Sequence, residues 1–139
     1  MPRVLIVDDE PDILLMLRVN LEAEGYETSL AADGETALRR LSEDSPDLMV
    51  LDVMMPVMDG WAVLDALRSE ASALPVVVLS AKTAPPDLVR ALELGASEYL
   101  TKPFDPSTLL ATIARVLQQS PEARADHRRE MIERLTEAE

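Results

Sequence analysis

Residues 4–8 read VLIVD, and the same pattern of four apolar residues followed by a polar one recurs as LMVLD at 48–52 and VVVLS at 76–80. Runs that are apolar at every position are typical of parallel strands buried on both faces. Two further segments, 26–31 and 98–100, are candidate strands that lack this continuous apolar pattern. The sequence therefore predicts five strands, at residues 3–7, 26–31, 47–51, 75–79 and 98–100.

Segments with helical spacing separate these strands. In the first segment Leu14, Leu17 and Leu21 recur at intervals of three and four residues, which places them on one face of a helix. Gly25 and Gly95 each stand between such a segment and a strand, where a left-handed residue ends a helix. The five β-α units predict an α/β domain over residues 1–118, with a doubly wound five-stranded parallel sheet covered by helices on both faces. The strand order does not follow from the periodicity.

The composition excludes several classes of protein. The chain has 139 residues, a net charge of −13 and no cysteine. An acidic surface repels phosphate backbones and anionic lipid, so we expect no direct nucleic-acid contact and no membrane association. Without cysteine there is no disulfide and no thiolate metal site. No apolar run approaches the ~18 residues that a membrane helix needs, and the N-terminal residues do not resemble a signal peptide. A cytoplasmic protein is expected.

Residues 119–139 differ from the rest, and we expect them to form a charged C-terminal helical tail or linker. Met131, Ile132 and Leu135 have helical spacing but form only a narrow apolar stripe. The favoured interpretation is a solvated helix or a frayed tail, because charge-rich helices without packing are marginally stable. The alternative is a helix that dimerises the chain or couples it to an output. His127 is expected to be a solvent-exposed helix residue, neither a metal ligand nor a phosphodonor.

Polar side chains follow four of the five predicted strands: Asp8 and Asp9 the first, Asp52 the third, Ser80 the fourth and Lys102 the fifth. Each alone fits a helix cap, a turn or a loop charge, but the carboxyl ends of parallel strands meet at one edge of a sheet, where ligands bind. Three carboxylates with one lysine suit Mg²⁺ or Mn²⁺ and disfavour Zn²⁺. A carboxylate can also act as a nucleophile and form an aspartyl phosphate, stabilised by a metal, a lysine and a hydroxyl.

Four motifs carry a resemblance to a known family. They are VLIVDDE at 4–10, LMVLDVMMPVMDG at 48–60, VVVLSA at 76–81 and GASEYLTKPF at 95–104. In this order and spacing they resemble the response regulator receiver domain of two-component phosphorelays. The resemblance implies a flavodoxin-like (βα)₅ fold, with residues beyond it as a C-terminal helical extension.

The resemblance also assigns roles to the polar residues. It implies that Asp52 is the phospho-acceptor and that Mg²⁺, or Mn²⁺ in its place, is the cofactor. It implies a switch in which the hydroxyl of Ser80 moves toward the phosphoryl group and Tyr99 rotates inward. The remaining roles it implies are metal binding by Asp9, Asp52 and the backbone carbonyl of Met54, water-mediated metal binding by Asp8, phosphoryl binding by Ser80 and Lys102, and a cis bond between Lys102 and Pro103.

The function implied is a phosphorylation-controlled signalling switch rather than an enzyme, with self-catalysed phosphotransfer and slow autodephosphorylation. Its partners would be a sensor histidine kinase or a phosphotransfer protein, and a downstream protein target or fused effector reached through the fourth helix, fifth strand and fifth helix. A second copy of the chain, in a homodimer, is a further candidate partner. Thr112 and Ser97 stand where many DNA-binding members carry an arginine and an acid, so that class's inter-subunit salt bridges are not expected by default.

Two other functions fit parts of the same pattern. A dehalogenase-type phosphatase would need an acid at Met54, two residues after the nucleophile, and is disfavoured. The main alternative is a pseudo-receiver that is not phosphorylated and acts as a dimerisation or binding scaffold.

Overall fold

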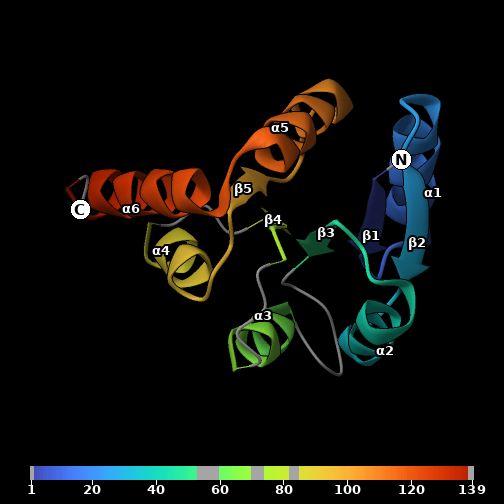
Figure 1. Ribbon diagram of the computed structural model, residues 1–139, viewed down its shortest axis with the longest axis horizontal. Coiled ribbons are helices and arrows are strands. Elements are labelled where there is room, and N and C mark those ends of the chain that lie inside the picture. Colours follow the sequence, from blue (N-terminus) through green and yellow to red (C-terminus); the bar gives the residue numbers. More distant parts are fainter. Residues whose placement is uncertain (1, 53–59, 70–73, 82–84, 138–139) are drawn as a thin grey trace.

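Five parallel strands form one sheet in the computed structural model, which describes residues 2–52, 60–69, 74–81 and 85–137 (Figure 1). The strand order is β2-β1-β3-β4-β5, the flavodoxin-like order. The predicted fold class is therefore confirmed. The strands are β1 (Arg3–Val7), β2 (Glu27–Ala31), β3 (Leu48–Asp52), β4 (Val76–Ser80) and β5 (Glu98–Thr101).

Three strands end one residue later than predicted. Asp52 pairs with Leu79, and Ser80 pairs with Thr101, so each polar residue is the last member of its strand. Strand pairing uses backbone groups, which continue beyond the point where the side chains stop being apolar. The extra residue fixes the backbone from which each polar side chain projects.

Helices cover both faces of the sheet. Figure 1 shows α1 and α5 on one face, α2, α3 and α4 on the other, and α6 beside α4 where the sheet ends at β5. Gly25 and Gly95 have φ angles of 93° and 110°, which confirms the predicted left-handed helix ends. The helices are α1 (Pro11–Ala23), α2 (Gly34–Asp44), α3 (Gly60–Ser69), α4 (Pro85–Glu93), α5 (Pro106–Gln118) and α6 (Pro121–Glu137).

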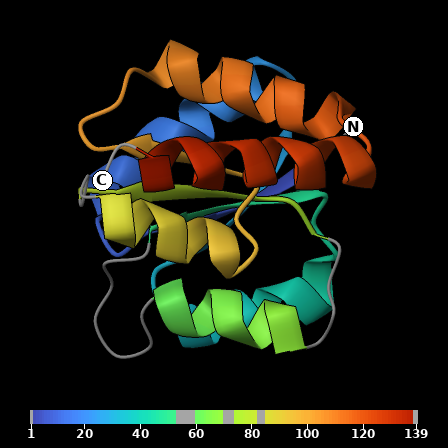
Figure 2. The ribbon, with the colours of Figure 1, turned by 90° about the vertical axis from the view of Figure 1, so that its left-hand side faces the viewer.

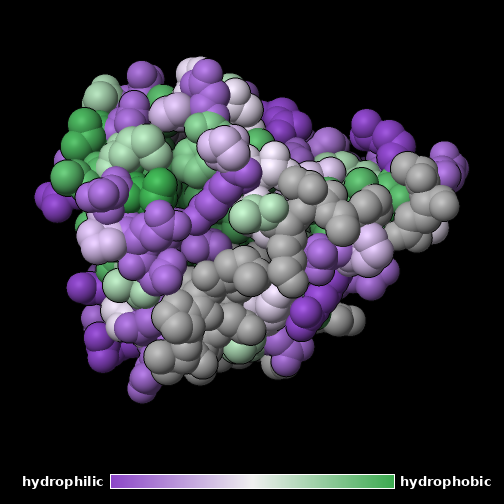
Figure 3. Space-filling view, turned by 180° about the vertical axis from the view of Figure 1, so that it is seen from behind, coloured by the Kyte–Doolittle hydropathy of each residue, from purple (hydrophilic) through white to green (hydrophobic). Residues whose placement is uncertain are grey.

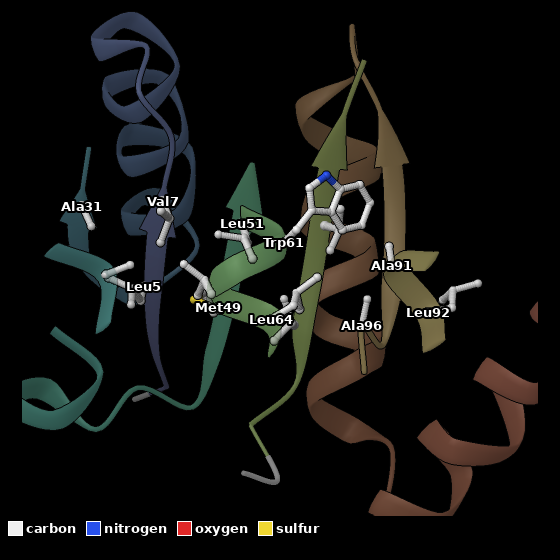
Figure 4. Packing of buried hydrophobic residues seen from close by; sticks show 14 of the residues in the cluster. Leu5, Val7, Ala31, Met49, Leu51, Trp61, Leu64, Ala91, Leu92 and Ala96 are labelled. Carbon is white, nitrogen blue, oxygen red and sulfur yellow. The ribbon is translucent and has the colours of Figure 1, made fainter. Parts of the chain in front are cut away.

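The core has two layers because successive strand residues point to opposite faces of the sheet. In β1, Val4 and Ile6 pack with α1 and α5, while Leu5 and Val7 belong to the layer under α2, α3 and α4. Figure 4 shows Leu5 and Val7 in this second layer, with Trp61 toward the arrowheads of the strands. Burial on both faces explains why β1, β3 and β4 are almost continuously apolar, whereas β2 and β5 at the edges of the sheet are not.

Replacing Leu5 with alanine is expected to lower the free energy of unfolding by about 3 kcal/mol, because the side chain is fully buried and the substitution leaves a cavity. Urea denaturation monitored by circular dichroism measures this change. Leu15→Ala is the matched control: Leu15 is 61% exposed on α1, where Figure 3 shows apolar surface, and its loss is expected to change stability by no more than about 0.5 kcal/mol. Equal losses in both variants would contradict this account of the core.

The C-terminal segment forms the predicted helix, and most of its side chains are exposed, but one face of it packs on the domain instead of being solvated all round or frayed. Residues 121–137 form α6, and Met131 is buried in the layer that contains α4. The predicted solvent exposure of His127 is wrong, because its ring is partly buried and lies 2.9 Å from a carboxylate oxygen of Glu98. That His127 is neither a metal ligand nor a phosphodonor stays a prediction. The sequence shows the apolar stripe of this helix, but it does not show that α4 and β5 provide a surface on which the stripe packs.

Within the described residues, none of the helices combines the length and apolar character that a membrane crossing requires.

Candidate functional site

Strands β1 and β3 are neighbours at the centre of the sheet, and the chain leaves them in opposite directions. β1 leads to β2 on one side, and β3 leads to β4 on the other. In open α/β sheets the carboxyl ends of two such strands flank the ligand crevice. Asp8 directly follows β1 and Asp52 ends β3, so both aspartates lie at this switch point. Both side chains are almost completely buried.

Lys102 joins the two aspartates. Its Nζ lies 3.1 Å from Oδ2 of Asp8 and 3.2 Å from Oδ2 of Asp52, and it donates a hydrogen bond to each. The backbone positions the lysine, because the Lys102 N–H donates to the carbonyl of Ser80 at 2.9 Å, just beyond the last pair of β4 and β5. Residues from the carboxyl ends of three strands thus meet in one charged cluster.

The charges in this cluster are unevenly balanced. Burial raises the pKa of Asp8, and the charge of Asp52 raises it further, although hydrogen bonds from the Glu10 N–H and from Lys102 act in the opposite direction. Burial alone would lower the pKa of Lys102, but the hydrogen bond to Asp8 and the charges of Asp52 and Asp8 outweigh it and leave that pKa raised. Lys102 therefore stays positively charged, and its single charge cannot neutralise all the carboxylates that surround it.

Oxygen ligands for a metal are present beside this lysine. One carboxylate oxygen from each of Asp8, Asp9 and Glu10 lies within 4.8 Å of the others. Such a carboxylate cluster suits a hard divalent cation. The raised pKa of Asp8 shows that the surrounding groups do not fully compensate its negative charge, which a bound cation would do. The residues present therefore fit Mg²⁺.

Glu10 was given no role from the sequence. Its Oε1 lies 3.6 Å from Nζ of Lys102, and its N–H donates to Oδ1 of Asp8 at 2.9 Å. The only signal in the sequence is its position directly after Asp9.

The other predicted residues lie in different places. Ser80 is buried at the end of β4, beside β3. The Lys102–Pro103 bond is cis. Tyr99 lies on β5, three residues before Lys102, and packs against the core layer beneath α4 and α6 rather than in the charged cluster. Met54 lies outside the described residues.

Curated relatives match the chain closely. It is 44% identical over 118 residues to the alkaline phosphatase synthesis transcriptional regulatory protein PhoP of Bacillus subtilis, covering 85% of this chain and 49% of that protein. It is 41% identical over 124 residues to the DNA-binding response regulator MtrA of Mycolicibacterium smegmatis, covering 89% and 54%. The chain spans about half the length of these relatives.

These relatives correct one prediction. We expected no direct nucleic-acid contact, but the matched proteins are named as transcriptional regulators and, for MtrA, as DNA-binding. The expectation rested on the net charge of −13. That charge describes a region equivalent to about half of such a relative, so it was the wrong basis for excluding nucleic acid.

Solved structures agree with the fold. The Francisella response regulator 1452 receiver domain has a TM-score of 0.82 at 33% identity, covering 85% of this chain and 98% of that one. The chemotaxis protein CheY4 of Vibrio cholerae has a TM-score of 0.79 at 38% identity, covering 84% and 98%.

The sequence model of the response regulator receiver domain matches residues 4–114, which include the acidic cluster, Ser80 and Lys102. Receiver domains are signalling domains of two-component systems rather than conventional enzymes. The chain belongs to the response regulator receiver domain family.

Proposed function

We propose that this chain is a phosphorylation-controlled switch in which Asp52 accepts a phosphoryl group from a phosphohistidine of a sensor histidine kinase or phosphotransfer protein, in a Mg²⁺-dependent reaction. The observation that carries the proposal is the position of Lys102. Its ammonium bridges Asp8 and Asp52, so positive charge is already in place beside the carboxylate that would become an acyl phosphate.

The chemistry follows from the groups present. An oxygen of Asp52 attacks the phosphorus, the P–N bond to the donor histidine breaks, and the imidazole leaves with its bonding electrons and takes up a proton. Lys102 compensates the charge on the phosphoryl oxygens, and Ser80 at the end of β4 supplies a hydroxyl donor. Mg²⁺, held by Asp9, Asp52 and the backbone carbonyl of Met54, with Asp8 acting through water, would neutralise further negative charge when bound.

The response would pass along β5. Lys102 lies just beyond the end of this strand and Tyr99 lies within it, so a new position of the ammonium can alter the packing of the aromatic ring. We propose that the changed surface is the face formed by α4, β5 and α5. Because the curated relatives are transcriptional regulators, the proposed output is control of transcription by a longer protein that contains this domain.

Incubation with acetyl phosphate and Mg²⁺ is expected to add one phosphoryl group, measured by mass spectrometry of the intact protein. Reduction of the acyl phosphate with borohydride, followed by peptide mapping, should place it on Asp52. A chelator should prevent the labelling, because the carboxylate cluster then lacks its divalent cation.

Two results would contradict the proposal. Labelling on His127 would identify a different acceptor, and the absence of labelling at saturating Mg²⁺ would support the pseudo-receiver function instead.

A further inference from the structure

Helix α6 covers the open edge of the sheet. β5 is the last strand, so one of its sides has no neighbouring strand. Figure 2 shows α6 running between α5 and α4 on this side of the molecule. Met131 is buried there, and Ile132 and Leu135 pack against the layer that contains residues of α4. The apolar stripe of α6 is therefore used within the chain, on part of the face proposed above as the output surface.

Polar contacts fix the position of α6 more specifically than this narrow stripe. Arg128 donates from Nε to the carbonyl of Ala96 at 3.0 Å and from Nη2 to the carbonyl of Gly95 at 3.2 Å. Both carbonyls belong to the turn between α4 and β5. Arg128 on α6 therefore supplies hydrogen bonds to two backbone carbonyls of this turn, which lies outside the hydrogen-bond patterns of α4 and β5.

Glu98 connects α6 to the rest of the face. This carboxylate at the start of β5 lies 2.9 Å from Nε2 of His127 on α6 and accepts a hydrogen bond of 2.7 Å from Arg115 on α5. Glu98 directly follows Ser97, the position where many DNA-binding members carry a second acid. Its carboxylate is engaged within the chain rather than left for a second subunit.

The docking of α6 is suited to reversal. Most of its side chains are exposed, and Met131 is its one buried residue among those described. Such a helix gains little from burial and depends on the Arg128 and His127 contacts for its place. Residues 119–120 separate α6 from α5, and α6 follows the last strand and helix of the five β-α units, so its release would leave the sheet and its covering helices in place.

Strand β5 links α6 to the phosphorylation site. Tyr99 packs against the same core layer as Met131, Ile132 and Leu135. Three residues further on, Lys102 contacts Asp52. A change at Asp52 that moves Lys102 and re-packs Tyr99 therefore alters the surface on which α6 rests.

We infer that α6 is an intramolecular latch on the face formed by α4 and β5: it is docked while Asp52 is unmodified and is released when Asp52 carries a phosphoryl group. The inference rests on the proposed function. By linkage, undocking of α6 favours modification by the same factor as modification favours undocking, so a variant that weakens the docked state should favour the modified state.

Hydrogen exchange tests the release directly. Beryllium fluoride with Mg²⁺ serves as the phosphoryl mimic on the full chain, and its binding is followed independently by fluorine NMR. Amides in residues 121–137 are expected to exchange about tenfold faster in the loaded protein, the size of a typical coupling. Amides of β1 and β3 should not exchange faster, because a ligand that binds the folded state stabilises the core.

Two variants at neighbouring positions separate loss of the latch contacts from the general effect of removing an arginine from α6. Arg128→Ala should speed exchange in α6 without the mimic and tighten binding of the mimic, because the docked state is weakened. Arg129→Ala is the matched control: this exposed arginine pairs only with the exposed Asp126 among the described contacts, and its loss should change neither measurement. Circular dichroism checks that both variants are folded.

The outcomes distinguish the two proposals. If fluorine NMR shows no bound mimic, the proposed function fails. If the mimic binds while exchange in α6 stays the same, or if Arg128→Ala and Arg129→Ala behave alike, the latch is refuted and the phosphorylation proposal stands. If Arg128→Ala does not fold, the comparison of loaded and unloaded wild-type protein decides alone.

Discussion

Replacement of Asp52 by asparagine is expected to abolish phosphoryl labelling by acetyl phosphate and Mg²⁺. Asparagine has nearly the same shape but lacks the anionic oxygen that attacks phosphorus. The site can tolerate the change, because the amide oxygen can still accept the hydrogen bond that Lys102 now donates to Asp52 at 3.2 Å. Intact-mass spectrometry is the measurement, and the expected loss is at least about 1000-fold, as for removal of a nucleophile.

Two controls separate the nucleophile from the metal ligands. Asp9→Asn should also label slowly, but higher Mg²⁺ should restore much of the rate because the acceptor is intact, whereas Mg²⁺ should not rescue Asp52→Asn. Asp65→Asn, the same substitution at an exposed position on α3, should label normally. Labelling that persists in Asp52→Asn would reassign the acceptor.

The fold could be predicted from the sequence because its signals are local. Each buried strand is a run of apolar residues, and Gly25 and Gly95 mark helix ends by their own backbone conformation. The strand order could not be predicted this way. It depends on which strands pair, as in Val50 with Val77, and such contacts join residues that are far apart in the chain.

The charged cluster could be anticipated from topology. Parallel strands bring their carboxyl ends to one edge, so Asp8, Asp52 and Lys102 were expected to meet although 94 positions separate the first from the last. The topology does not predict which of these side chains contact one another. That Lys102 contacts both aspartates at similar distances, and also approaches Glu10, depends on side-chain geometry.

The docking of α6 escaped prediction for a related reason. Its sequence shows four arginines and a narrow stripe, which describe a solvated helix equally well. The partners of Arg128 are the backbone carbonyls of Gly95 and Ala96, and backbone groups have no sequence signature. Likewise, nothing local predicts that Glu98 accepts from Arg115 and contacts His127.

Lys102→Met is expected to change phosphoryl labelling and metal affinity in opposite directions. Labelling should fall about 100-fold, because a charged donor to the phosphoryl oxygens is lost. Mg²⁺ should bind about tenfold more tightly, because the ammonium that now neutralises Asp8 and Asp52 no longer competes with the metal. The metal affinity is measured from the Mg²⁺ dependence of the urea midpoint, since a ligand that binds only the folded state stabilises it.

The same variant should be less stable without metal, by about 3 kcal/mol at neutral pH, because two buried carboxylates then lack their cation. Acidification should recover part of this loss: burial raises the pKa of Asp8 in the folded state, so the folded protein takes up a proton more readily than the unfolded chain, and stability rises as pH falls. Lys102→Arg is the matched control, because it keeps the charge and should leave metal affinity and stability nearly unchanged. If Lys102→Met instead weakened Mg²⁺ binding, the lysine would be organising the metal ligands rather than competing with the metal for their charge.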